Sequence, residues 1–300
     1  MATTLGILAL LLWSMLALLG TLTTDIPALQ LLSLCFFISA LLMPIKRLVN
    51  GKSILKKPAL TKPQWLIGIM GLFGFHLCYF LALKFAPAIE VSLIVYTWPL
   101  LLTLFVSSTH TRLSAAIGGL LGFIGIVFIV AGGNEVSLDN RYVLGYLLSL
   151  ACAIIWSSYS WFLTRSQSHV DDVGWLSLLV ALFALIAHFS FEADQGKWQL
   201  SWQEWIGVIL LGLGPVGGAF YLWDIALKQG NRVLLASLSF GTPLLSAIIL
   251  ALAGLNAWSI NIVIALILIL AGAIIANKNW LRGVETKLYR RFATAAKQPK

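Results

Sequence analysis

Long apolar runs, separated by short stretches that contain charge, proline or glycine, follow one another along the whole chain. A helix of about 20 apolar residues is long enough to cross a lipid bilayer. The flanking charged, proline and glycine residues set the edges of ten such runs. These predicted spans cover residues 3–20, 26–45, 65–84, 87–107, 114–132, 143–163, 173–191, 203–225, 233–253 and 259–277. The pattern therefore predicts an all-α polytopic membrane protein with ten transmembrane helices.

The composition agrees with this pattern and excludes a soluble globular protein. Of the 300 residues, 60% are hydrophobic and only 10% are charged, and the mean hydropathy is +0.94. The ten spans use about two-thirds of the chain, so no loop is long enough to hold a separate soluble domain. Cys35, Cys78 and Cys152 lie far apart within apolar runs, and this spacing predicts neither a metal site nor a disulfide.

Basic residues are distributed unequally between the two sides of these spans. Seventeen of the 20 lysine and arginine residues fall on one side, in alternate loops and in the tail that begins at Lys278. Because cytoplasmic loops retain lysine and arginine, both termini are predicted to be cytoplasmic and the protein to lie in the cell inner (plasma) membrane. This placement explains the net charge of +9 without a nucleic-acid partner. The basic tail 281–300 is expected to anchor at membrane lipid, with a protein partner as the alternative.

Short sequence matches relate the two halves of the chain. Leu12–Ser14 resembles Ile155–Ser157 at a separation of 143 residues. The chain is therefore predicted to be a duplication, with one repeat over residues 1–135 and a second over residues 136–280. An odd number of spans, five in each repeat, makes the two repeats cross the membrane in opposite senses. Such inverted repeats are typical of transporters with a binding site near the midplane.

Three tryptophans lie where the usual interfacial preference of this residue gives no reason for them. Trp13, Trp98 and Trp156 are each about ten or more residues inside a span, on the order of 15 Å from the membrane surface. Other polar and aromatic residues share this depth, so the set predicts a cavity lined by aromatic rings. Simple filling of helix interfaces is the alternative, and for any single serine it is the favoured one. The predicted substrate-binding residues are Trp13, His76, Tyr79, Tyr96, Trp98, Trp156, Ser157 and Ser239.

Two prolines lie in the middle of spans at corresponding places in the repeats. Pro99 and Pro243 are 144 residues apart. Each removes a backbone hydrogen bond, so each is predicted to kink its helix and to serve as a hinge, with a static kink as the alternative. Tyr96 and Trp98 are two residues apart, about 160° around a regular helix. Only one of them is expected to face the centre unless Pro99 distorts the helix.

Ionisable residues within the spans are few. His76 is the deepest, and it is predicted either to carry protons or, as the favoured interpretation, to form a hydrogen-bonding part of the cavity wall. Glu90 follows Pro87 by one turn and is expected to stabilise a helix N-terminus, with recognition of a substrate amine as the alternative. Asp224 and Lys228 have the spacing of an ion pair within one helix.

The paired repeat, with a Trp–Ser pair near the start of each half and a proline in the fourth span of each, resembles the EamA-type members of the drug/metabolite transporter (DMT) superfamily. This resemblance extends over essentially the whole chain. Within the superfamily, Ala88–Val91, Tyr96–Pro99 and the stretch Gly230–Pro243 are similar to the aromatic amino-acid exporters. The resemblance implies export of a small molecule, and it associates Tyr96 and Trp98 with the substrate.

These observations together predict a secondary transporter that exports aromatic and other hydrophobic amino acids by alternating access around a midplane cavity. An exporter of a different small metabolite or of a cationic drug is the alternative. An intramembrane enzyme is disfavoured because the four histidines are isolated and no HExxH or GxSxG motif occurs. The chain has no Walker motif, so ATP is not expected to be the direct energy source, and uniport and proton antiport both stay open.

The remaining expectations concern what the protein binds. No catalytic residue, metal or cofactor is predicted. The expected partners are a small-molecule substrate, namely an aromatic amino acid, and membrane lipid. The protein is expected to function as a monomer.

Overall fold

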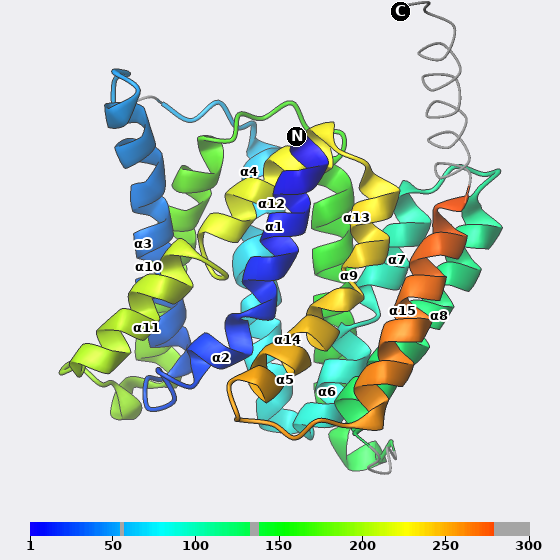
Figure 1. Cartoon of the computed structure of the whole chain (residues 1–300). Coiled ribbons are helices and arrows are strands. Elements are labelled where there is room, and N and C mark those ends of the chain that lie inside the picture. The colour runs from blue at the N-terminus through cyan, green and yellow to red at the C-terminus, as the bar shows by residue number, and fades with distance from the viewer. Residues whose placement is uncertain (55–56, 133–137, 279–300) are drawn as a thin grey trace, which may run out of the picture.

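A computed structural model describes residues 1–54, 57–132 and 138–278 of the chain (Figure 1). Every regular element in these ranges is a helix, as the sequence predicts. The predicted tail 281–300 and the predicted repeat boundary at residues 135 and 136 lie outside the described residues.

The helices of the first half follow the predicted spans in order. Their bounds are α1 Ala2–Ser14, α2 Leu16–Gly20, α3 Ala28–Val49, α4 Lys62–Ile69, a π-helical turn Met70–Gly74, α5 Phe75–Phe85, α6 Ala88–Val95, α7 Trp98–Val106 and α8 Arg112–Ala131. Local sequence sets several of these limits. Thr61 and Gln64 form a capping box at the start of α4, and α8 ends at Gly132, whose φ of +60° suits glycine.

The second half has the same succession of whole and interrupted helices. Its elements are a 3₁₀ turn Asn140–Tyr142, α9 Val143–Leu163, α10 Asp172–Phe191, a 3₁₀ turn Ala193–Gln195, α11 Trp202–Leu213, α12 Gly218–Gln229, α13 Arg232–Leu238, α14 Gly241–Leu252 and α15 Ile260–Ala276. A capping box of Ser201 and Glu204 begins α11.

Eight spans in the described part of the chain are long and apolar enough to cross a membrane. A ninth forms if α13 and α14, which are bent by 43° at a short break, are counted together. The apolar helix α15 is shorter, with 17 residues, about 26 Å at 1.5 Å per residue. The prediction of an all-α polytopic membrane protein is confirmed, with eight or nine spans supported by length and composition where the sequence predicted ten.

The closest helix packing joins one half of the chain to the other. Helix α3 packs on α10, α8 on α15, α1 on α12 and α5 on α9. The contact of α8 with α15 depends on Gly118 and Gly272, because a Cβ on either glycine would overlap the carbonyl oxygen of the other. The two halves therefore form one interlocked bundle.

The bundle has an N-terminal end and an opposite end. The N-terminal end carries the N-terminus and the last turn of α15, which both lie on the upper side of the bundle in Figure 1. A hydrogen bond of 3.0 Å from the backbone N–H of Asn231 to the Thr3 hydroxyl holds the start of α13 at this end. The opposite end carries the loop from Gly20 to Ala28.

Candidate functional site

A cavity of about 360 Å³ lies inside the bundle. It extends from Trp13 and Trp156 in the middle to Gly20 and Ala28, so it reaches toward the opposite end. Six of the eight predicted site residues line it, and both halves of the chain contribute. They are Trp13, His76, Tyr79, Tyr96, Trp98 and Trp156.

Four indole rings gather at the inner wall of the cavity. Trp13 contacts Trp156 edge to face at a centroid distance of 5.6 Å and Trp223 at 5.2 Å. Trp98 lies 6.2 Å from Trp156 and 6.4 Å from Trp223, again edge to face. These are favourable aromatic geometries. Because Trp223 is 1% exposed, it fixes the wall from behind.

The indole N–H of Trp13 is satisfied by the backbone of the other half. Its Nε1 donates to the carbonyl oxygen of Pro215 at 3.0 Å. That carbonyl is free because the helix is interrupted between α11 and α12. Gly217 makes this interruption possible, since a Cβ there would overlap the carbonyl oxygen of Gly212.

A π-helical turn over Met70–Gly74 immediately precedes His76. Such turns inside α-helices are frequent at functional sites. His76 donates from Nδ1 to the carbonyl oxygen of Leu72 at 2.6 Å. The imidazole contacts Phe36 and Phe75 edge to face, with centroids 5.6 and 5.1 Å away. The unused nitrogen, Nε2, is then the polar atom that His76 offers to the cavity wall.

Both Tyr96 and Trp98 line the cavity, which a regular helix would not allow. The span is interrupted between α6 and α7, and Pro99 occupies the first turn of α7. The Thr97 hydroxyl donates to the carbonyl of Ile94 at 2.7 Å within this interruption. The helix is therefore distorted next to Pro99, which is the condition under which the sequence allowed both Tyr96 and Trp98 to face the centre.

The corresponding interruption in the second half separates α13 from α14. Pro243 is buried in the first turn of α14, and the two helices meet at 43°. Thr242, the repeat counterpart of Trp98, lines the cavity, and its hydroxyl oxygen is buried without a hydrogen-bond partner among the described residues. The structure thus shows an interrupted helix just before both prolines, with a bend of 43° at the second, while hinge motion stays a prediction.

The structure does not bring Ser157 and Ser239 to the cavity. The Ser157 hydroxyl donates to the carbonyl of Ala153 at 2.6 Å, and that of Ser239 donates to the carbonyl of Leu235 at 2.8 Å. Both side chains are fully buried. Each hydroxyl is satisfied within its own helix, which matches the helix-interface interpretation favoured for single serines.

Several cavity residues escaped the sequence analysis. Phe75, Phe80 and Phe220 line the cavity, and Trp223 packs behind it. The repeat separation of 144 residues, applied to His76, leads to Phe220 and could have found it. Glu90, in contrast, does not line the cavity; its carboxylate accepts a hydrogen bond from the Tyr146 hydroxyl.

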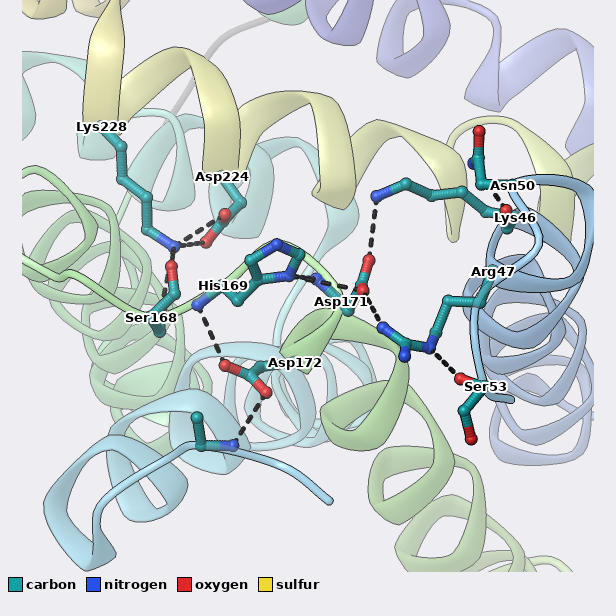
Figure 2. Close-up of polar contacts among 11 residues, drawn as sticks. Lys46, Arg47, Asn50, Ser53, Ser168, His169, Asp171, Asp172, Asp224 and Lys228 are labelled. Carbon is teal, nitrogen blue, oxygen red and sulfur yellow. Dashed lines mark hydrogen bonds and ion pairs between the residues drawn. The ribbon is translucent and has the colours of Figure 1, made fainter. Parts of the chain in front are cut away.

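Charged residues close the N-terminal end of the bundle (Figure 2). Lys46 and Arg47 at the end of α3 each reach Asp171 at 2.9 Å. Burial raises the pKa of Asp171, but the hydrogen bonds from Lys46 and Arg47 more than offset this and hold the pKa below its usual range. The predicted pair within α12 is confirmed, with Lys228 2.8 Å from Asp224.

Further hydrogen bonds join this cluster to neighbouring segments. Asp172 accepts from the backbone N–H groups of Ala59 and His169 at 3.1 and 3.0 Å. Lys228 also donates to the carbonyl of Ser168 at 2.7 Å. The ends of α3 and α12 and the segment that begins α10 are therefore connected by these contacts (Figure 2).

Comparison with known proteins identifies the family. The model of the EamA-like transporter family matches residues 1–131 and again residues 143–278. The chain belongs to the EamA-like transporter family. The family model matches twice, once in each half, and together the two matches cover most of the chain.

Similar proteins carry a common description. The aromatic amino acid exporter YddG of Ancylobacter novellus is 40% identical over 92% of this chain and 96% of its own. YddG of Escherichia coli K12 is 26% identical over 83% of this chain and 87% of its own. A crystal structure 38% identical in sequence superposes with a TM-score of 0.85, covering 94% of this chain and 98% of that chain. These EamA-like relatives support a membrane exporter.

Proposed function

We propose that this protein exports aromatic and other hydrophobic amino acids by alternating access around the 360 Å³ cavity. The observation that carries the proposal is the meeting of aromatic and imidazole side chains from both halves at one cavity in mid-bundle. The volume lies in the range of sites that enclose small molecules. The relatives named as aromatic amino acid exporters favour the same substrate class.

The chemistry of the wall suits an amino acid with a large apolar side chain. Indole and phenyl rings take an aromatic side chain by edge-to-face contact and attract an ammonium group through their faces. The polar end of the substrate then has the Nε2 atom of His76 and the Thr242 hydroxyl as partners. A cationic drug would use the rings but would leave the partners for a carboxylate unused.

Alternating access is proposed on the relation between the halves. The cross-half packing of α1 on α12 has a counterpart in that of α9 on α5. The spans containing Pro99 and Pro243 are interrupted at corresponding positions. Two inverted repeats of five helices account for these pairs, and rocking of one repeat against the other would expose the cavity on alternate sides.

We place both termini in the cytoplasm of a cell inner-membrane protein, with the N-terminal end of the bundle facing inward. Lys46, Arg47 and Lys228 lie at that end, and the cytoplasmic side of membrane proteins carries an excess of lysine and arginine. After removal of the native cysteines, Asn50→Cys should be protected from an impermeant reagent outside the cell and Gln199→Cys should react. Labelling of Asn50→Cys alone would reverse the orientation.

The substrate is tested by flux of phenylalanine and tryptophan in proteoliposomes that contain the purified protein. We expect Trp98→Ala and Trp156→Ala each to reduce flux by about tenfold or more, as removal of a main ring contact predicts. The matched control is Trp205→Ala, because Trp205 is 41% exposed and lies outside the cavity. Normal flux in well-folded Trp98→Ala and Trp156→Ala proteins would refute the aromatic-cavity proposal. Transport of a cationic drug without either amino acid by the unmodified protein would favour the alternative substrate.

A further inference from the structure

A second, much smaller void of about 20 Å³ lies toward the N-terminal end of the bundle. It has room for about one water molecule and none for an amino acid. Tyr159 separates it from the large cavity, since this side chain lines the void and contacts Trp156 at a centroid distance of 5.5 Å. The void therefore lies directly behind the aromatic wall.

Six of the fourteen residues that line the void are repeat counterparts of residues that line the large cavity. The separations are 143 or 144 positions, the same as those of the sequence repeat. The matched pairs, with the large-cavity residue first, are Leu16 and Tyr159, Gly20 and Leu163, Ala28 and Asp172, Leu32 and Leu176, and Phe80 and Asp224. Ile67 of the void pairs in the same way with Leu211 of the large cavity. The void is thus the closed counterpart of the open cavity.

The two counterparts differ in chemistry. Apolar Phe80 and Ala28 of the large cavity correspond to the carboxylates Asp224 and Asp172 of the void. Leu16 corresponds to Tyr159. The void is therefore lined by anionic groups and a hydroxyl at positions where the open cavity has carbon alone.

Tyr159 supplies an independent sign that the void accepts a ligand. Its side chain is 4% exposed, and its hydroxyl makes no hydrogen bond to any residue in the described part of the chain. The Tyr159 hydroxyl is therefore free to bond to a ligand that enters the void. Asp224, in contrast, is 3% exposed and holds the Lys228 ammonium group at 2.8 Å. An ammonium group is thus already bound at this carboxylate, and the tyrosine hydroxyl beside it is unused.

We propose that this void opens into a second binding site at the cytoplasmic end, where Asp224 and Tyr159 take the ammonium group of an amino-acid substrate before export. The substrate ammonium replaces that of Lys228 on Asp224, and Lys228, released from the carboxylate, faces the substrate carboxylate. This proposal rests on the proposed function and adds to it an entry site of opposite polarity to the aromatic cavity. Movement of Tyr159 away from Trp156 joins the two sites.

Inside-out membrane vesicles expose the cytoplasmic end and allow a direct test with phenylalanine as the transported probe. Two inhibitors separate the charged groups: phenethylamine keeps the ammonium group, and 3-phenylpropionate keeps the carboxylate. In Asp224→Asn, we expect inhibition by phenethylamine to weaken by about tenfold or more, the loss expected for a charge-assisted hydrogen bond. Inhibition by 3-phenylpropionate should change by less than about twofold. Equal weakening of both inhibitors, or of neither, would overturn the proposal.

Tyr159→Phe provides a second variant that keeps the ring and its contact with Trp156. We expect Tyr159→Phe to weaken inhibition by phenethylamine by about threefold or more, with membrane abundance unchanged. Unchanged inhibition by phenethylamine in Tyr159→Phe would show that the Tyr159 hydroxyl does not bind the ammonium group.

The matched control is Asp171→Asn, which removes a buried carboxylate at the same end that does not line the void. The ratio of the two inhibition constants should stay as in the unmodified protein. A changed ratio in Asp171→Asn would mean that the effect belongs to the whole charged cluster and would overturn the specific site. Failure of the proposed function is distinguished from these outcomes, because the unmodified protein would then carry no phenylalanine at all.

Discussion

The third and eighth spans occupy corresponding places in the two halves, and both depart from a regular helix at the same depth. In the third span, the π-helical turn Met70–Gly74 continues the helix from α4 into α5. In the eighth, the helix stops at Leu213 and restarts at Gly218. The first departure presents a side chain, His76, to the cavity, and the second presents a backbone carbonyl, that of Pro215, to Trp13.

This difference shows how irregularities at corresponding positions of the two halves can serve two purposes. A π-helical turn re-aims side chains while keeping the backbone hydrogen-bonded. A full break frees carbonyl groups, which must then find partners inside the bundle. The third span is therefore suited to contact a substrate, and the eighth is suited to fix the position of Trp13. The four predictions below test this assignment.

The largest effect is expected from Gly217→Ala, which places a side chain within the interruption between α11 and α12. The new Cβ would overlap the carbonyl oxygen of Gly212, and a backbone atom cannot move aside. We expect a loss of about 3 kcal/mol or more in stability, measured by thermal unfolding in detergent and by membrane abundance. Gly241→Ala is the control, since nothing lies within 4 Å of a Cβ at that position. Equal stability of the two variants would show that the break does not depend on Gly217.

A smaller effect is expected from Gly71→Ala in the π-helical turn. There the new Cβ would lie 2.3 Å from Cγ and 2.8 Å from Cβ of Tyr159, so the clash is with the base of a side chain and not with a carbonyl of the backbone. We expect a loss of about 1 to 3 kcal/mol in thermal stability, together with a change in phenylalanine flux because Tyr159 contacts Trp156. A loss as large as that of Gly217→Ala would show that the side-chain overlap at Gly71 costs as much stability as the closer backbone overlap at Gly217.

Trp13→Phe should have a more modest effect, because it keeps a ring and removes one hydrogen bond. The carbonyl of Pro215 then loses its partner, at a loss of about 1 kcal/mol in stability. Trp156→Phe is the comparison, since no hydrogen bond from the Trp156 indole occurs in the described part of the chain. Thermal unfolding of both should show the larger decrease for Trp13→Phe, and the reverse order would disprove an anchoring function for the break.

The smallest effect is expected from His76→Gln. As a wall residue, His76 contributes one polar atom, so its replacement should change the KM for phenylalanine by about threefold. The response of flux to a pH gradient across proteoliposomes should be the same in both proteins. Uphill transport driven by the gradient and lost only in His76→Gln, with downhill exchange intact, would instead identify His76 as a proton carrier.

The sequence was sufficient for features that follow from depth and composition. Interfacial preference made Trp13, Trp98 and Trp156 conspicuous, and the structure brings all three to one cavity. Trp223 escaped because the predicted span ended at residue 225, whereas the interrupted span continues to Gln229. Depth counted along an uninterrupted helix is misleading once the helix breaks.

Other features depend on contacts that no local pattern records. Ser157 and Ser239 have the depth expected of cavity residues, but each hydroxyl bonds to its own helix. The meeting of Asp171 with Lys46 and Arg47 joins positions more than 120 residues apart. Rotation of a helix about its axis and pairing between distant loops are set by tertiary packing, so the structure was needed for both.

The hydrogen bond from Trp13 to Pro215 also has a consequence for synthesis of the protein. The two residues are 202 positions apart, and α1 packs mainly on α12. During translation at about 5 to 20 residues per second, α1 waits about 10 to 40 s in the membrane before its partner emerges. Throughout that interval the indole N–H depends on water, lipid headgroups or the insertion machinery for a hydrogen bond. The packing of the first helix on α12 is therefore a late step of assembly, and the cavity exists only after that step.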